Sequence, residues 1–249
     1  MNLDTLLTPG ELPALARRDL RDAVCVVFDV LRATSTFVTA LHHGAREIIP
    51  VCEIAEAVAL RRQRPEVRLA GERDGVRISA ALADGDDFDF GNSPREFTPA
   101  RVQDQTIVST TTNGTRALRA CAAAKTILAA SFLNLAATAE CLRGENHILL
   151  VCAGTGENAA VEDILAAGAL VEMLLPRVTD RPAVWQVAAS TQWSYAHLKA
   201  DLAAVLGNTE NGRRLLARPE LRDDVAFCAQ LNVFNLVARL HTNGALRRD

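Results

Sequence analysis

The hydrophobic positions of this chain follow two alternating patterns. Runs of consecutive apolar and β-branched residues, such as Ala-Val-Cys-Val-Val-Phe at 23–28, predict buried strands. The stretches between these runs are rich in Ala and Leu and repeat their apolar residues every three or four positions, which predicts helices. The expected strands are 23–28, 47–52, 67–70, 106–109, 126–130 and 147–152, and the expected helices are 36–43, 53–63, 114–124, 135–142 and 162–175. This alternation predicts βαβ units and an α/β fold of mainly parallel sheets with flanking helices.

The pattern changes towards the end of the chain. We expect helices at 184–206 and 209–217, and strands at 224–228 and 237–240 with a hairpin turn at 241–244. The C-terminal region is therefore expected to combine helices with short strands.

We expect two α/β lobes with the site between them. An irregular stretch ends at Thr98-Pro99, so the boundary is placed near residue 100. The N-terminal lobe would then cover residues 1–100 and the C-terminal lobe residues 101–249.

Composition narrows the class of protein. The chain has 249 residues, of which 49% are hydrophobic and 23% are charged, and its net charge is −3. These values are typical of a globular protein, and no basic stripe indicates a nucleic-acid partner. The apolar runs are too short to span a membrane, no signal peptide is expected, and the six cysteines form no CxxC pair. We therefore expect a cytoplasmic protein with reduced thiols and no membrane partner, with a homodimer as a candidate assembly.

Polar side chains collect in five stretches that follow or adjoin expected strands. These stretches are 29–36, 71–75, 88–94, 110–116 and 152–158, the last followed closely by Glu162 and Asp163. Because ligands of an open parallel sheet bind at the carboxyl ends of its strands, we expect the five stretches to converge on a site. Each stretch alone also has an ordinary structural interpretation, since hydroxyls cap helices and Gly and Asn form turns.

The residue types in these stretches suit a phosphorylated substrate. Arg binds phosphate oxygens in pairs, helix N-termini attract anions, and carboxylates without His or Cys favour Mg²⁺ over Zn²⁺. Other phosphatase classes are excluded by spacing, because the sequence has no Cys-x5-Arg motif and no His in the five stretches. A haloacid-dehalogenase type would need a second Asp at position 31, where the chain has Leu31.

Several blocks in a fixed order resemble one family. The blocks are DVLRATST, AGERDG, FDFGNSP, TTTNGTRAL, SFLN and CAGTGENAAVED. They are similar to the signature blocks of the Mg²⁺-dependent 2-phosphosulfolactate phosphatases of coenzyme M biosynthesis. The resemblance runs over about residues 24–169 and resumes at 223–240, in DVAFCAQLNVFNLVARL. It implies a two-lobed α/β fold and hydrolysis of a small phosphorylated acid, 2-phosphosulfolactate, to 3-sulfolactate and phosphate.

The resemblance also implies a role for each matched side chain, with Mg²⁺ as the cofactor. The candidate catalytic residues are Asp29, Arg32 and Arg116. The candidate substrate-binding residues are Thr34, Ser35, Arg73, Asn92, Ser93, Thr111, Thr112, Asn113, Gly114 and Thr115. The candidate metal ligands are Asp29, Glu72, Asp89, Glu162 and Asp163.

Three of these side chains receive specific interpretations. Asp29 is a Mg²⁺ ligand or the nucleophile, Arg32 is the phosphate clamp, and Arg73 meets the carboxylate or sulfonate end of the substrate. The alternatives are a non-catalytic binder of a phosphorylated or sulfonated metabolite, and a lyase or phosphotransferase that uses the same anion site. The segment 75–88 is longer than the family pattern, which bears on the identity of the substrate.

Overall fold

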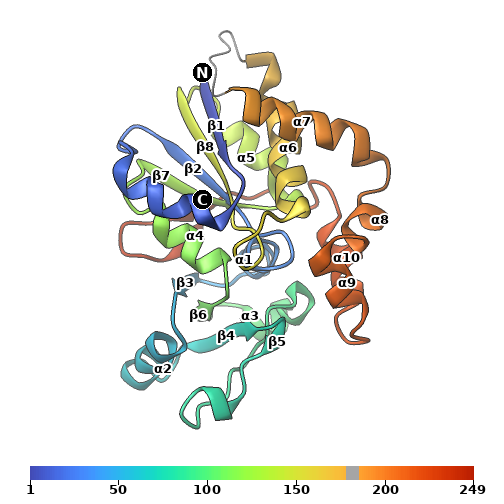
Figure 1. Ribbon diagram of the computed structural model, residues 1–249. Coiled ribbons are helices and arrows are strands. Elements are labelled where there is room, and N and C mark those ends of the chain that lie inside the picture. The colour runs from blue at the N-terminus through green and yellow to red at the C-terminus, as the bar shows by residue number, and fades with distance from the viewer. Residues whose placement is uncertain (178–184) are drawn as a thin grey trace.

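The computed structural model describes residues 1–177 and 185–249. In these residues ten strands form one sheet in the order β1-β8-β2-β7-β9-β10-β3-β6-β4-β5 (Figure 1). The strands are β1 (Asn2–Leu6), β2 (Val24–Phe28), β3 (Glu47–Val51), β4 (Arg68–Arg73), β5 (Val76–Arg77), β6 (Thr106–Thr110), β7 (Thr126–Ala130), β8 (His147–Cys152), β9 (Ala238–Leu240) and β10 (Leu246–Arg248). The predicted α/β class with mainly parallel strands is confirmed.

Helices cover both faces of the sheet around β2. The α-helices are α1 (Ala33–His42), α2 (Ile54–Gln63), α3 (Pro99–Val102), α4 (Gly114–Ala120), α5 (Leu135–Cys141), α6 (Val161–Leu174), α7 (Trp185–Leu198), α8 (Leu202–Gly207), α9 (Glu210–Leu216) and α10 (Asp223–Cys228). Short 3-10 helices lie at Pro9–Arg17, Ala80–Leu82, Pro94–Glu96, Phe132–Asn134, Leu175–Arg177 and Lys199–Asp201. Because successive strand residues point to opposite faces, Cys25 and Val27 pack with α1 and α4, whereas Val26 and Phe28 pack with α5 and α6. This two-sided burial explains why β2 reads as a continuous apolar run.

Two blocks of parallel strands make up most of the sheet. β1, β8, β2 and β7 form the first block, and β3, β6 and β4 form the second. The hairpin of β9 and β10 joins them, since β9 pairs antiparallel with β7 and β10 pairs antiparallel with β3. The strands of the two blocks therefore run in opposite directions. Figure 1 shows the first block in the upper half and the second in the lower half, with α1 and α4 between them.

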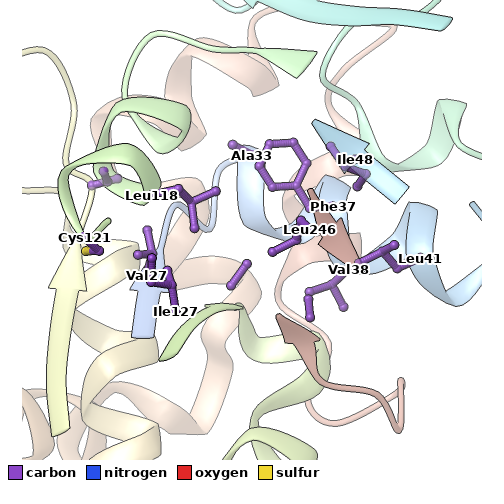
Figure 2. Packing of buried hydrophobic residues seen from close by; sticks show 14 of the residues in the cluster. Val27, Ala33, Phe37, Val38, Leu41, Ile48, Leu118, Cys121, Ile127 and Leu246 are labelled. Carbon is purple, nitrogen blue, oxygen red and sulfur yellow. The ribbon is translucent and has the colours of Figure 1, made fainter. Parts of the chain in front are cut away.

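Helix α1 is anchored to both blocks. Its residues Phe37 and Leu41 lie in one core with Ile48 of β3, Leu246 of β10 and Val27 of β2 (Figure 2). Burial of side chains of this size is worth about 1.5–3 kcal/mol each. The start of α1, which directly follows the end of β2, is thus fixed where the two blocks meet.

Two expected elements differ from the structure. Residues 224–228, expected as a strand, belong to α10, in which Val225 and Cys228 are buried three positions apart. A short apolar run does not distinguish a strand from a buried helix, so the tertiary contacts decide. The expected helix 184–206 ends at Leu198 and resumes as α8, because the Asp201 carboxylate accepts a hydrogen bond from the Ala204 N–H at 3.0 Å. Residue 184 lies outside the described residues.

The C-terminal hairpin is confirmed. The His241 N–H donates to the Ala245 carbonyl at 2.9 Å, and the Gly244 N–H donates to the His241 carbonyl at 2.9 Å. The short strands β1, β5 and β10 were not among the expected elements, because their sequences mix polar and charged residues into very short runs.

Strand pairing crosses residue 100 in both blocks, since β2 pairs with β7 and β8, and β3 pairs with β6. The division into lobes at 1–100 and 101–249 stays a prediction. In the described part of the chain, every helix is too short or too polar to cross a membrane.

Candidate functional site

A polar cavity of about 300 Å³ opens where the loops after β2, β6 and β8 meet the turn between β4 and β5. We call it the central cavity. All five polar stretches of the sequence reach it, together with helix α9. Its lining residues are Asp29, Leu31, Arg32, Glu72, Asp74, Gly75, Asn92, Thr112, Asn113, Gly154, Thr155, Gly156, Asn158, Glu210, Asn211, Arg214 and Leu215. The structure therefore brings the five stretches together, although the strands of the two blocks run in opposite directions.

Asp29 lies at the carboxyl end of β2 and faces the start of two helices. Its Oδ1 accepts a hydrogen bond from the Ala33 N–H at 3.0 Å, at the beginning of α1. On the opposite side, a Cβ on Gly114 would lie 2.6 Å from Asp29 Oδ2 and 2.7 Å from the Cβ of Ala33. Because the Ala33 Cβ cannot move away without its backbone, glycine lets the loop after β6 approach this carboxylate.

The Asp29 carboxylate is buried among other acids. Burial, together with the charges of Glu72 and Glu162, raises the pKa of Asp29 to about 7, although hydrogen bonds from the N–H groups of Ala33 and Gly114 act in the opposite direction. A buried acid with a pKa this far above its usual range marks a candidate functional group.

Glu72 of β4 is the second carboxylate on the cavity wall. Its Oε1 accepts hydrogen bonds from the N–H and the Oγ1 of Thr112, both at 2.9 Å. Its Oε2 accepts a hydrogen bond from the Gly75 N–H at 2.8 Å. Glu72 therefore ties the β4–β5 turn to the loop after β6.

Glu162 and Asp163 lie behind the cavity wall, in the first turn of α6. Asp163 accepts hydrogen bonds from the N–H groups of Val30, at 2.8 Å, and Gly154, at 3.0 Å. Glu162 accepts a hydrogen bond from the Asn211 side chain at 2.6 Å. Burial raises the pKa of both carboxyls. These two acids hold the loops after β2 and β8 and the start of α9 in place.

Arg32 is buried, and its guanidinium joins two distant parts of the chain. It donates to the Asp224 carboxylate of α10 at 2.8 Å and to the Gly75 carbonyl at 2.8 Å. Asp224 is fully buried and also accepts a hydrogen bond from the Ser93 hydroxyl at 2.7 Å. Arg32 thus lines the cavity in a fixed orientation.

Several sequence-predicted residues do not line the central cavity, and Asp89, Arg73 and Arg116 have their polar contacts elsewhere. Asp89 forms ion pairs with Arg61 and with Arg68, the latter at 3.1 Å. Arg73 donates to the carbonyl of its neighbour Glu72 at 2.7 Å and is absent from the cavity lining. Arg116 is exposed and lines a separate cleft of about 660 Å³ between the Pro9–Arg17 helix and α4.

Most of the predicted hydroxyl residues hold the backbone of these loops. Thr34 and Ser35 donate to the carbonyls of Asp29, at 2.9 Å, and Val30, at 2.8 Å. Thr111 and Thr115 bond each other through side chain and backbone. The contacts of these hydroxyls are therefore explained by a structural role in the turns at the helix starts. Of the remaining predicted substrate contacts, Asn92, Thr112 and Asn113 line the central cavity.

Several cavity residues have no counterpart among the sequence-predicted sites. They are Asp74, Gly154, Thr155, Gly156, Asn158, Glu210, Asn211 and Arg214, with Asp224 behind Arg32. The glycines and Asn158 lie in the recognised block after β8, so their position was a usable signal. The residues of α9 belong to a polar helix without any motif, and only the tertiary fold places them here.

The side chains that line the cavity determine which metal ion it could bind. Among the described residues, no three His, Cys, Asp or Glu side chains are grouped tightly enough to form a complete cage for an ion. Mg²⁺ does not require such a cage, because it usually binds one or two carboxylates and keeps waters and substrate phosphate as its other ligands. Asp29 and Glu72 both face the cavity, and neither His nor Cys is found among the lining residues that the structure describes. This oxygen-only set fits Mg²⁺.

Known proteins are similar to this chain over most of its length. A model of the 2-phosphosulpholactate phosphatase family matches residues 9–243. The probable 2-phosphosulfolactate phosphatase of Pseudothermotoga lettingae is 40% identical over 214 residues, which cover 86% of this chain and 88% of that protein. Those of Caldanaerobacter subterraneus and Clostridium novyi are 37% and 30% identical, over 92% and 97% of both chains. The resemblance seen in the signature blocks therefore extends through the region that builds the cavity, and the chain belongs to the 2-phosphosulfolactate phosphatase family.

Proposed function

We propose that this protein is a Mg²⁺-dependent phosphatase that hydrolyses 2-phosphosulfolactate to 3-sulfolactate and phosphate. One observation carries the proposal: Asp29 and Glu72 meet Arg32 in one cavity of a chain that belongs to this family. A phosphate monoester needs both a cationic contact and a metal-binding carboxylate close to its phosphorus. The cavity offers these groups together.

Asp29 and Glu72 are the residues that would hold Mg²⁺. When bound, the ion supplies positive charge to the phosphoryl oxygens. Water then bonds to phosphorus while the bond from phosphorus to the ester oxygen breaks, and one water proton ends on that oxygen. Asp29 would act in this step as a metal ligand. If Asp29 instead attacked phosphorus itself, the ester bond would break as its carboxylate oxygen bonded to phosphorus, and water would then have to break that new bond and release phosphate.

Arg32 would bind the phosphoryl group. Two of its hydrogen bonds go to Asp224 and to the Gly75 carbonyl, which fixes the plane of the guanidinium before the substrate arrives. A group oriented in advance loses little entropy on binding, so its interaction is available to the transition state. The N-terminus of α1, next to Asp29, adds a partial positive charge on the same side.

The family resemblance also makes coenzyme M biosynthesis in the cytoplasm the proposed setting. Assembly as a homodimer stays a prediction.

Phosphate release from 2-phosphosulfolactate, with and without Mg²⁺, tests the proposal. We expect turnover that a chelator abolishes and Mg²⁺ restores. Full activity in a chelator-treated, metal-free sample would show that the metal assignment is wrong. Thermal stabilisation by the substrate without phosphate release would instead identify a non-catalytic binder.

A further inference from the structure

Helix α9 contributes to the central cavity although no signature block covers it. Glu210, Asn211 and Arg214 line the cavity. The family-like blocks end near residue 169 and resume at 223, so these side chains lie between them. Their position in the cavity suggests that they contact a part of the substrate that the strand-end loops do not contact.

The charges of the cavity wall single out Arg214. Four acids line the cavity, Asp29, Glu72, Asp74 and Glu210, and among its described lining residues the cations are Arg32 and Arg214. A substrate that carries phosphate, carboxylate and sulfonate brings several negative charges to this acidic wall. Cations that can accept a new anionic partner therefore decide which substrate binds.

The two arginines differ in the partners they already have. Arg32 is paired at 2.8 Å with Asp224, and the two side chains are 3% and 0% exposed. Arg214 is paired at 3.1 Å with Glu210 one helical turn away, and these side chains are 43% and 64% exposed. An exposed pair of this kind is weak and exchanges readily for another anion. Arg214 is thus the cation that is free to move onto a ligand.

Arg214 also lies beside the turn that carries the proposed catalytic contacts. A Cβ on Gly75 would lie 4.0 Å from Arg214 Cδ. Gly75 donates its N–H to Glu72 and accepts a hydrogen bond from Arg32. A ligand held between Glu72 and Arg32 is therefore within reach of the Arg214 side chain.

We propose that Arg214 binds the sulfonate of the substrate and sets the preference for sulfonated phosphoacids. The inference rests on the proposed function for the identity of the substrate. In 2-phosphosulfolactate the carboxyl carbon is attached to the carbon that bears the phosphate, whereas the sulfonate is one carbon further away. The group that extends furthest from phosphorus meets the exposed rim, where Arg214 lies. Its guanidinium can donate two parallel hydrogen bonds to two sulfonate oxygens.

This assignment replaces the sequence-based interpretation of Arg73. The Arg73 guanidinium donates to the Glu72 carbonyl at 2.7 Å and to the Thr110 hydroxyl at 3.1 Å. These contacts hold the end of β4 against β6. They leave recognition of the distal anion to Arg214.

A comparison of two variants on two substrates tests the proposal. Arg214→Gln and the wild type are assayed with 2-phosphosulfolactate and with 2-phospholactate, which lacks the sulfonate. We expect kcat/KM to fall about 10- to 100-fold for the sulfonated substrate, as for loss of one charged hydrogen-bonded contact, and to change little for the other. Arg214→Lys should recover part of the loss, because the charge remains and the paired geometry does not.

Arg213→Gln is the matched control. Arg213 neighbours Arg214 on α9, is absent from the cavity lining and donates to the Asn208 carbonyl at 2.5 Å. It should behave as the wild type with both substrates. An equal loss with both substrates in Arg214→Gln would overturn the sulfonate contact while leaving the phosphatase function standing.

Binding of the product separates the inference from the proposed function. We expect 3-sulfolactate to bind Arg214→Gln about 10- to 100-fold more weakly than the wild type in a calorimetric titration, and lactate to bind both alike. This difference without any phosphate release would support the sulfonate site and refute the phosphatase. Equal binding of 3-sulfolactate to both proteins would refute the sulfonate site whatever the activity.

Discussion

Two regions of the molecule meet at the central cavity and are built differently. One is the set of loops after β2, β6 and β8 with the end of β4 and its turn, which carries Asp29 and Glu72. The other is the segment α9 to α10, which contributes Arg214 to the cavity and places Asp224 behind Arg32. The loops are fixed to one another by hydrogen bonds such as those of Glu72 and Asp163. Helices α9 and α10 reach the loops through the side chains of Asn211 and Asp224 and pack Leu215 and Val225 into the core.

The difference shows that the positions of site residues depend on two different features of the fold. A residue that follows a strand is held by the sheet, so within each parallel block its position follows from the order of strands. A residue on a helix that returns to the sheet edge depends on which face is buried, as Leu215 and Val225 are here. We therefore expect the loops to determine the chemistry, and the helices to determine orientation and substrate preference.

The largest effect is expected at Asp29. Asp29→Asn keeps the shape of the side chain but removes the charge that would bind Mg²⁺ or attack phosphorus. We expect kcat to fall on the order of 10³-fold, with circular dichroism unchanged. Near wild-type turnover would show that Asp29 only shapes the turn.

Asp89→Asn is the matched control for this prediction. Asp89 was predicted from the sequence as a metal ligand, but it is paired with Arg61 and Arg68 away from the cavity. The substitution should lower stability modestly and leave kcat near the wild-type value. Equal losses at both positions would mean that the cavity does not distinguish functional from structural acids.

Asp224→Asn tests how strongly the second region supports the first. The substitution leaves the Arg32 charge buried without its carboxylate partner, which is 2.8 Å away in the wild type. We expect the free energy of unfolding to fall by about 3 kcal/mol, measured by urea denaturation. Arg95→Gln removes a partly exposed cation that lies 3.1 Å from Asp223 and 3.8 Å from Asp224 but leaves the Arg32–Asp224 pair in place, so it should cost less than about 1 kcal/mol. Similar costs for the two variants would refute the central role of the buried pair.

Arg32→Lys isolates the geometry of the guanidinium. Lysine keeps the charge but cannot hold Asp224, the Gly75 carbonyl and a phosphoryl oxygen in one plane. We expect both kcat and kcat/KM to fall about 10- to 100-fold, because the contact matters most in the transition state. Arg73→Lys should leave both constants close to the wild type. A reversed pattern would exchange the roles of the two arginines.

Much of the fold could be predicted from the sequence because β2, β7 and β8 are buried on both faces. Such strands appear as unbroken apolar runs, and the helices between them keep their period. The run at 224–228 misled the prediction, since Val225 and Cys228 suit a buried strand and a buried helix equally well. Short edge strands such as β5 depend on pairing partners rather than on their own residues.

The site could be predicted from the sequence only where its residues lie at or near the ends of strands. Asp29 and Asn113 follow β2 and β6, Glu72 lies at the end of β4, and Asn92 follows Phe90, which bridges to Ala70 of β4. All four line the cavity as expected. Asp89 belongs to an equally polar stretch, but ion pairs with two arginines hold it elsewhere. Arg214 carries no signal in its own neighbourhood, and its role follows from the distance between α9 and the β4–β5 turn.

The smallest expected effect concerns the pH dependence of the free energy of unfolding. It compares the loops with Asp29 protonated and with Asp29 charged. The pKa of Asp29 is about 7 in the folded protein, against an ordinary value of 3.8. The folded state therefore binds this proton more tightly than the unfolded state does. Lowering the pH through 7 should stabilise the metal-free protein, and raising it above 7 should leave the full cost of the buried charge.

Between pH 8 and pH 6 this single group should add about 1 kcal/mol to the free energy of unfolding. Other groups also titrate in this range, so the informative quantity is the difference between the wild type and Asp29→Asn, measured by urea denaturation at both pH values. The variant lacks the titrating carboxyl and should lose this part of the pH dependence. Mg²⁺ at pH 8 should stabilise the wild type more than the variant, because the ion compensates the charge that the proton neutralises at pH 6. Identical pH dependence in the two metal-free proteins would mean that burial does not hold a proton on Asp29. The buried carboxylate of the loops would then titrate no differently from the exposed charges of α9.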